Sequence, residues 1–269
     1  MRPSRIKSKL ARKKPVLVTS IHFSDPSIFE LVSLMGFDGI WLDMEHHAHT
    51  LEAANNYIRA ARVGASDVIT RPAKGEFMRM ARMLEAGAKG IMYPRCDSAA
   101  EAAEVVRWSK FAPLGERGID TANPDSPYCS MPLQEYIEAA NRETFIIIQL
   151  EQPSAVDQVD SIAAVPGVDI LMLGPADFSV LSGIPGQVEH PLVSDARKKI
   201  AAAARNAGIN WGTTCGSRRE IEESLELGAR FICYGADILS VKQGFEQVRD
   251  ECSTLGFTFD DPSEKRVAL

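Results

Sequence analysis

Apolar and polar residues follow a repeated two-part pattern along the chain. A stretch with apolar residues three or four apart, typical of an amphipathic helix, is followed by a glycine, a short linker and a mainly apolar run. The glycines in this position are Gly36, Gly64, Gly87, Gly167, Gly208 and Gly228. Each fits the residue just after a helix, where the backbone turns left-handed before a strand. The pattern therefore predicts helices alternating with strands.

Two further apolar runs complete a set of eight expected strands. The eight expected strands lie at 16–21, 39–43, 67–71, 90–94, 144–151, 169–173, 210–214 and 230–234. The runs are short and apolar on both faces, as in buried parallel strands. Eight alternating units predict a closed (β/α)8 barrel, a TIM barrel that occupies residues 1–269 as a single domain. An open doubly wound sheet is the alternative, but no GxGxxG turn follows the first strand.

Three segments depart from this rhythm. The start of the chain, 1–16, has seven basic residues and no acidic ones. Ile6 and Leu10 predict a short helix there, with an apolar stripe against the barrel and solvated basic side chains. A segment rich in Pro, Gly, Ser and Asp at 111–141 is an insertion in one unit, either a cover for the active site, a subunit contact or a surface excursion. The segment 254–269 is expected to be an irregular tail.

Composition and charge limit the kinds of partner that are expected for this protein. The chain has 269 residues, 45% of them hydrophobic, and a formal net charge of −6. Basic residues form no stripe along the body of the chain, so neither a nucleic acid nor a membrane is expected as a partner. Five scattered cysteines predict reduced thiols, and no apolar run approaches the roughly 20 residues of a membrane span. A cytoplasmic protein with a small-molecule substrate is therefore expected.

Polar side chains gather where the expected strands end, which is where barrels carry their chemistry. Glu151 and Asp177 follow two neighbouring strands, where an unpaired carboxylate would be costly. They predict a cation between them, with Mg²⁺ best suited to oxygen ligands and Mn²⁺ or Co²⁺ able to substitute. Alternatively, each carboxylate pairs with a basic side chain or caps a helix.

Gln149 and Arg71 are candidates for contact with a substrate. Gln149 lies two residues before Glu151, so both point to the same side of the strand. It either orients a substrate carboxylate or is a hydrogen-bonded core residue. Arg71 either stabilises an enolate oxygen or forms a salt bridge with Asp43 or Glu45.

Histidines follow the second expected strand in the motif DMEHHAH. One of them, acting as a general base, is favoured over a zinc site, because the adjacent His46 and His47 would point apart and no HExxH spacing is present. Glu85, late in the helix after the third strand, could orient such a histidine if that end of the helix lies near the site. Otherwise it is a solvated carboxylate.

Six segments occur in a characteristic order: GFDGIWLDMEH, VITRP, EAGAKGIMYP, PLGERGI, IIIQLE and GVDILMLGPADFS. Together they resemble the HpcH/HpaI family of class II pyruvate-dependent aldolases, over nearly the whole chain. The resemblance implies a divalent-metal-dependent enzyme that reversibly cleaves a 4-hydroxy-2-oxo acid to pyruvate and an aldehyde. It also implies a homo-oligomer, such as a hexamer.

The resemblance assigns roles to individual residues. It implies that Glu151 and Asp177 bind the metal, that His46 is the catalytic histidine and that Arg71 stabilises the enolate. The pyruvate carboxylate would be held by Gln149 and by the turn of Gly174, Pro175, Ala176 and Asp177, with the Ala176 N–H as a donor. Glu85 falls where the family has an aspartate that raises the basicity of the histidine, and the longer side chain is a departure.

Specificity and reaction class leave alternatives open. Ser20, His22 and Thr214 lie at the ends of the first and seventh expected strands and predict a polar pocket that favours a hydroxylated aldehyde. The rival enzyme classes are an acyl-CoA lyase of the citrate lyase β or malyl-CoA lyase type and an oxaloacetate decarboxylase. A catalytically silent, metabolite-binding barrel is the non-enzymatic alternative.

Overall fold

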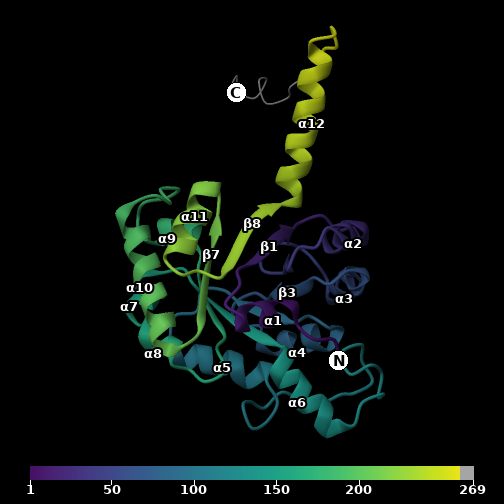
Figure 1. Ribbon diagram of the computed structural model, residues 1–269, viewed down its shortest axis with the longest axis vertical. Coiled ribbons are helices and arrows are strands. Elements are labelled where there is room, and N and C mark those ends of the chain that lie inside the picture. The colour runs from purple at the N-terminus through teal and green to yellow at the C-terminus, as the bar shows by residue number, and fades with distance from the viewer. Residues whose placement is uncertain (261–269) are drawn as a thin grey trace.

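Eight parallel strands close into a barrel in their order along the chain (Figure 1). A computed structural model describes residues 1–260. The strands are β1 (Val16–Ile21), β2 (Gly39–Asp43), β3 (Asp67–Arg71), β4 (Gly90–Tyr93), β5 (Phe145–Leu150), β6 (Ile170–Leu173), β7 (Asn210–Cys215) and β8 (Phe231–Ala236). The predicted (β/α)8 barrel is confirmed, and each expected strand overlaps an observed one.

Helices alternate with the strands and surround the barrel. They are α1 (Arg5–Ala11), α2 (Pro26–Leu34), α3 (Leu51–Ala60), the 3-10 helix η1 (Ala61–Val63), α4 (Phe77–Ala86), α5 (Ala99–Ser109), α6 (Leu133–Glu143), α7 (Pro153–Asp157), α8 (Val159–Ala163), α9 (Pro175–Leu181), α10 (Pro191–Ala207), α11 (Arg218–Glu226) and α12 (Asp237–Ser253). Because the helices between consecutive strands return the chain to the start of the next strand, the last helix of each such connection ends at the N-terminal end of the barrel.

The glycines that precede the strands serve two purposes. Those at 36, 87, 167, 208 and 228 have φ between 72° and 106°, the left-handed turn predicted for them. Gly64 is different, because its φ is −110°. A Cβ at Gly64 would lie 2.4 Å from the carbonyl oxygen of Ser33. Glycine is needed there for close packing of the backbone, so the prediction of a left-handed turn at this position is wrong.

Inward-facing side chains fill the barrel in the alternation expected of strands. They form one buried cluster that includes Val18, Trp41, Ile147 and Met172. Ile6 and Leu10 of α1 belong to the same cluster, so the first helix closes the N-terminal end of the barrel. Further along the strands, toward their C-terminal ends, the inward positions become polar.

The basic residues of α1 are bound rather than solvated. Arg5 and Lys9 contact the carboxylate of Asp38 at 2.7 and 2.6 Å, and Lys7 lies 3.1 Å from Asp169. These aspartates precede strands, so they lie at the N-terminal end of the barrel beside the helix. The expectation of solvated basic side chains is therefore wrong for these three residues, because acidic residues distant in sequence meet them. It holds for Arg12, Lys13 and Lys14, which are exposed.

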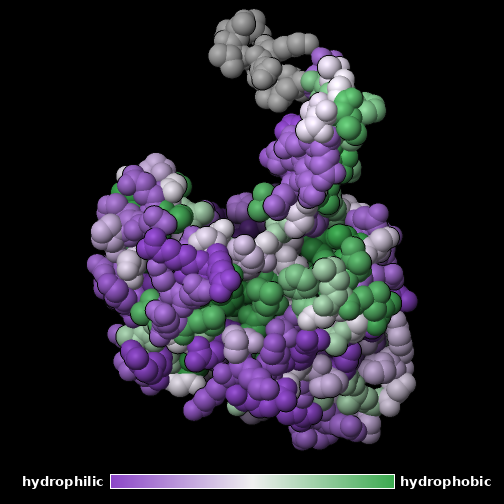
Figure 2. Space-filling view, turned by 45° about the horizontal axis from the view of Figure 1, so that its top comes forward, coloured by the Kyte–Doolittle hydropathy of each residue, from purple (hydrophilic) through white to green (hydrophobic). Residues whose placement is uncertain are grey.

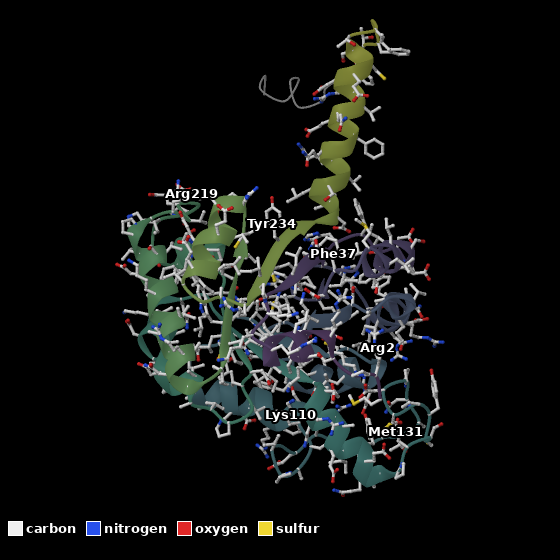
Figure 3. The ribbon with its side chains drawn as sticks, viewed as in Figure 1. Arg2, Phe37, Lys110, Met131, Arg219 and Tyr234 are labelled. Carbon is white, nitrogen blue, oxygen red and sulfur yellow. The ribbon has the colours of Figure 1, made fainter. Side chains whose placement is uncertain are left out.

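The segment at 111–141 lies between α5 and β5, and therefore at the N-terminal end of the barrel. Asp125 within it forms a buried ion pair with Lys89, which immediately precedes β4, at 3.2 Å. Lys110 and Met131 are labelled at the end of the molecule remote from α12 in Figure 3. Because active sites of such barrels lie at the other end, this segment does not cover the mouth.

The last helix, α12, does not pack on the barrel. It leaves β8 and projects from the body of the molecule (Figure 1). Residues 254–260 follow it without regular structure, and the rest of the expected tail lies outside the described residues. Among residues 1–260, no helix is both long enough and apolar enough to span a bilayer.

Candidate active site

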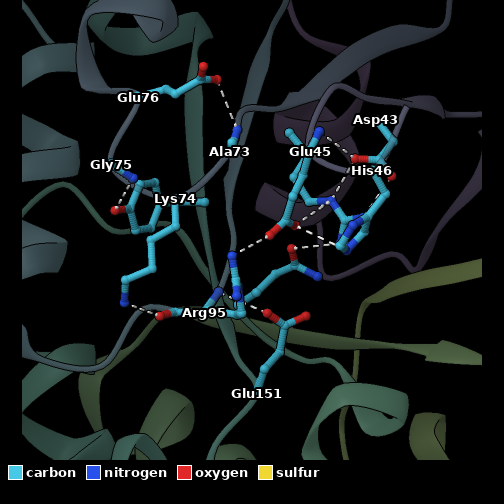
Figure 4. Close-up of polar contacts among 12 residues, drawn as sticks. Asp43, Glu45, His46, Ala73, Lys74, Gly75, Glu76, Arg95 and Glu151 are labelled. Atoms are coloured by element: carbon cyan, nitrogen blue, oxygen red, sulfur yellow. Dashed lines mark hydrogen bonds and ion pairs between the residues drawn. The ribbon is translucent and has the colours of Figure 1, made fainter. Parts of the chain in front are cut away.

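The mouth at the C-terminal ends of the strands holds a connected group of buried charges (Figure 4). Asp43 ends β2, Arg71 ends β3, Gln149 lies one residue before the end of β5, and Glu151 follows β5. In all four the side chain is almost wholly buried. The barrel register aligns Asp43 with Arg71, which places the first ion pair across neighbouring strands.

Arg71 is held on several sides. Its Nε and Nη2 donate to the two carboxylate oxygens of Asp43 at 2.9 and 2.7 Å, and Nη1 lies 3.4 Å from the Gln149 Oε1. The guanidinium carbon lies 4.5 Å from the centre of the Trp41 ring. Although burial alone would lower its pKa, the hydrogen bonds and charge of Asp43 raise the pKa of Arg71 above its usual value. The group is a permanent, oriented positive charge.

Glu45 connects this arginine to the rest of the mouth. Its carboxylate lies 3.3 Å from the Arg71 Nε, 3.1 Å from the Arg95 Nη2 and 3.7 Å from the His46 Nε2. The His46 side chain is 59% exposed, so its ring borders the open mouth. The salt-bridge alternative for Arg71 is thus present in the structure, and it orients the arginine without removing it from the mouth.

Glu151 is the least compensated charge in the group. Its Oε2 accepts one hydrogen bond from the Arg95 backbone N–H at 2.8 Å. Burial, reinforced by the nearby Asp177 carboxylate, raises the pKa of Glu151 to about 7. On the other side, a Cβ at Gly174 would lie 2.4 Å from Glu151 Oε1. Glycine at 174 therefore makes room for this carboxylate.

These residues fit a divalent ion. The mouth brings together four carboxylates, from Asp43, Glu45, Glu151 and Asp177, and two guanidinium groups. A cation beside Glu151 and Asp177 would relieve the burial and repulsion that raise the pKa of Glu151. Among residues 1–260 no cluster of three or more potential ligands forms. Two carboxylates suffice for Mg²⁺, because it commonly completes its shell with water and substrate oxygens.

The turn after β6 supplies backbone groups beside this carboxylate pair. Gly174 precedes α9, and Pro175, Ala176 and Asp177 form its first turn. The early N–H groups of a helix have no partner within it. Gly174 packs against the Glu151 carboxylate, and Asp177 is near enough to raise the Glu151 pKa, so this predicted turn lies beside Glu151.

Glu85 is separated from the other predicted residues. It lies one residue before the end of α4, and its own carbonyl accepts from the Asp125 N–H in the segment at the N-terminal end of the barrel. Burial raises its pKa. His46 lies at the opposite end, because helices run antiparallel to the strands. The two residues do not meet within one chain, so the condition set for their pairing is not fulfilled.

Two groups in the mouth were missed by sequence reasoning. Arg95 follows β4 and provides both a backbone donor to Glu151 and an ion pair to Glu45. The signal was a charged residue just after an expected strand, at a position one beyond GIMYP. Asp237 begins α12 and accepts from His22 Nδ1 at 3.0 Å. No local pattern linked these two residues, which are distant in sequence.

Comparison with known proteins identifies the family. The family model described as HpcH/HpaI aldolase/citrate lyase matches residues 21–243. The chain belongs to this family. A hydroxypyruvate/pyruvate aldolase from Paraburkholderia phytofirmans is 30% identical, with 91% of this chain and 97% of that protein covered. A 5-keto-4-deoxy-D-glucarate aldolase from Klebsiella pneumoniae is 27% identical, with 92% and 96% covered.

Solved structures agree with this assignment. An HpcH/HpaI aldolase from Desulfitobacterium hafniense superposes with a TM-score of 0.87 at 30% identity, covering 95% of this chain and 98% of that one. The protein is accordingly an enzyme of the aldolase type, a carbon–carbon lyase that acts on small molecules. Enzymes of this family are generally dependent on a divalent metal.

Proposed function

We propose that the protein is a class II aldolase that reversibly cleaves a 4-hydroxy-2-oxo acid to pyruvate and an aldehyde. The observation that carries the proposal is the undercompensated Glu151, buried beside Asp177 and within the same group of charges as Arg71. Glu151 and Asp177 would hold Mg²⁺, Mn²⁺ or Co²⁺. Bound there, the ion would supply positive charge that stabilises an enolate.

The residues of the chain have separate tasks in the proposed cleavage. Gln149 and the N–H of Ala176 hold the substrate carboxylate. His46 accepts the proton of the C4 hydroxyl, the C3–C4 bond breaks, and the aldehyde leaves. Arg71 stabilises the enolate oxygen that results, and a proton returned to C3 completes pyruvate. Synthesis is the reverse sequence.

Exchange of the pyruvate methyl protons with D₂O, followed by NMR, tests this function without knowledge of the aldehyde. Protein treated with EDTA should be inactive, and Mg²⁺, Mn²⁺ or Co²⁺ should restore exchange. Glu151→Ala should abolish it, whereas Asp195→Asn, a carboxylate exposed on α10, should not. Absence of exchange in folded protein with every metal would contradict the proposal.

The same sample separates the rival reactions. Release of acetyl-CoA from a hydroxyacyl-CoA, without cleavage of free hydroxy-oxo acids, would indicate the acyl-CoA lyase. Faster loss of CO₂ from oxaloacetate than cleavage of any aldol would indicate the decarboxylase. A silent metabolite-binding barrel would bind pyruvate without any exchange.

We also infer that the protein is a homo-oligomer in which α12 packs on a second copy. The helix carries exposed apolar side chains, among them Leu239, Phe245 and Val248. The side of the barrel that α12 leaves also exposes apolar side chains: Leu17 of β1, Tyr234 of β8, Leu34 at the end of α2 and Met35 just after it. Figure 2 shows hydrophobic surface at the foot of the projecting helix, and Figure 3 labels Tyr234 there.

The exposed apolar side of the barrel in one copy can be covered by the projecting α12 of another copy, and the reverse contact covers the second copy in the same way. Light scattering should find an oligomer for the natural chain. Phe245→Glu should dissociate it, whereas Gln247→Glu on the same helix should not. A monomeric natural chain, or an oligomer indifferent to Phe245→Glu, would contradict the inference.

A further inference from the structure

A second cluster of polar groups lies across the mouth from Glu151. His22 follows β1, His47 follows β2, and Asp237 follows β8. In a barrel of eight strands in sequence order, this arc is opposite β5 and β6. The His22 and His47 side chains are 27% and 33% exposed, so both rings are accessible from the mouth.

Asp237 fixes the orientation of His22. Its carboxylate accepts the backbone N–H groups of His22, Phe23 and Ile238 at 2.8 to 3.0 Å, and it accepts His22 Nδ1 at 3.0 Å. Only 1% of the Asp237 side chain is exposed. Because a carboxylate is an acceptor, Nδ1 donates to it, and Nε2 is left free to form a hydrogen bond with a ligand.

His47 is held in a comparable way. Its ring packs edge-on against His22 with centres 4.6 Å apart, and its Nε2 lies 3.8 Å from the Asp43 carboxylate. These contacts place the ring beside His22 and beside the Asp43–Arg71 ion pair. Burial lowers the pKa of His47 below its usual value, although the charge of Asp43 opposes this effect.

We propose that His22 and His47 form the acceptor part of the active site and select a hydroxylated aldehyde. This inference rests on the proposed aldolase function. With the enolate held on the Glu151 side, the aldehyde must lie between it and these rings. Both imidazoles present ring nitrogens that can form hydrogen bonds with hydroxyl groups, as donor or as acceptor.

The same ring nitrogens disfavour an acceptor without a hydroxyl group. An unsubstituted aldehyde has no hydroxyl with which to satisfy them. A site that is built to bond a substrate hydroxyl discriminates strongly against an analogue without it. The expected acceptors are therefore 2-hydroxyaldehydes, in line with the hydroxylated aldehyde predicted from Ser20, His22 and Thr214.

The test compares glycolaldehyde with acetaldehyde, which differ by one hydroxyl, in aldol addition to pyruvate. His22→Phe keeps an aromatic ring for the contact with His47 and removes both nitrogens. It should lower the ratio of kcat/KM for glycolaldehyde to that for acetaldehyde by about 10-fold or more. His47→Phe provides a second variant that tests the same ratio should the first fail to fold. His190→Asn, outside the mouth and able to keep its helix cap, should leave the ratio unchanged.

The outcomes distinguish this inference from the function on which it rests. An unchanged ratio in both folded phenylalanine variants, or a natural enzyme that prefers acetaldehyde to glycolaldehyde, would overturn the acceptor assignment alone. Absence of pyruvate methyl exchange in the natural enzyme would instead overturn the proposed aldolase.

Discussion

The two ends of the barrel both bury charged residues, but they treat them differently. At the N-terminal end, Asp38 accepts from Arg5, Lys9 and the Leu17 N–H, and Lys89 is paired with Asp125. At the mouth, Glu151 has one backbone donor, and its pKa is raised to about 7. The chain itself neutralises Asp38 and Lys89 at the N-terminal end, whereas Glu151 at the mouth is left for a ligand.

The difference shows how burial of charge can be interpreted. A buried charge with a full set of partners maintains the structure, and its loss should lower stability. A buried charge with too few partners lowers the stability of the free protein. It gains the missing partners when a cation or substrate binds. Substitutions at the N-terminal end should therefore change mainly the free energy of unfolding, and substitutions at the mouth mainly the activity.

The largest effect on activity is expected from Glu151→Gln. The amide keeps the volume but removes the charge that would hold the metal, so metal-dependent exchange of pyruvate protons should fall by about 10³-fold or more. The melting temperature in EDTA should not decrease, because a buried charge is removed. If the variant were strongly destabilised but kept normal exchange, Glu151 would maintain the structure and would not hold the metal.

Arg71→Lys is expected to lower kcat by about 10²-fold. The ammonium retains the positive charge but cannot make the paired contacts that Arg71 makes with both oxygens of Asp43. Steady-state kinetics of aldol cleavage provide the measurement. A change confined to KM would instead indicate that Arg71 contributes to binding and not to the transition state.

At the other end, Asp125→Asn is expected to lower the free energy of unfolding by about 3 kcal/mol, because it leaves buried Lys89 without its counter-charge. Denaturant unfolding measures this loss. Exchange activity below the melting temperature should stay within about 3-fold of the natural value. Loss of activity in folded Asp125→Asn protein would show that the two ends are coupled.

Stability in EDTA should fall as pH rises, through Glu151. The folded-state pKa of Glu151 is about 7, above its ordinary value of 4.5, so the contribution of this group is fully present below about pH 4.5 and is lost as pH rises through about 7. The full change in the free energy of unfolding is about 3 kcal/mol.

The measurement is the melting temperature at about pH 5 and about pH 8, with EDTA or with Mg²⁺. Mg²⁺ should stabilise the natural chain more at the higher pH, and Glu151→Gln should lack both dependences. An equal response to Mg²⁺ in the natural chain and in Glu151→Gln would place the ion elsewhere.

The smallest effect is expected from Glu85→Gln. Because Glu85 lies at the N-terminal end, away from His46, kcat should change by less than about 3-fold. His46→Gln, in contrast, should lower it by about 10²-fold. A large loss of kcat in Glu85→Gln would mean that Glu85 reaches a histidine of another copy, provided that the natural chain and the variant no longer differ in kcat once the oligomer is dissociated.

Much of the barrel and part of its mouth followed from the sequence. The strands were predicted because buried parallel strands are short apolar runs with turn residues at their ends, and that signal is local. Arg71, Gln149, Glu151 and Asp177 were found because strand ends in a barrel converge.

Only the tertiary structure decided contacts between residues distant in sequence. It separated Glu85 from His46, joined His22 to Asp237, and brought Arg95 beside Glu45. It also showed that α12 leaves the barrel, which its apolar pattern could not reveal. An amphipathic pattern indicates that one face of a helix is buried, but it does not indicate which surface buries it. That surface depends on the fold of the whole chain and, for α12, on the second copy proposed to cover it.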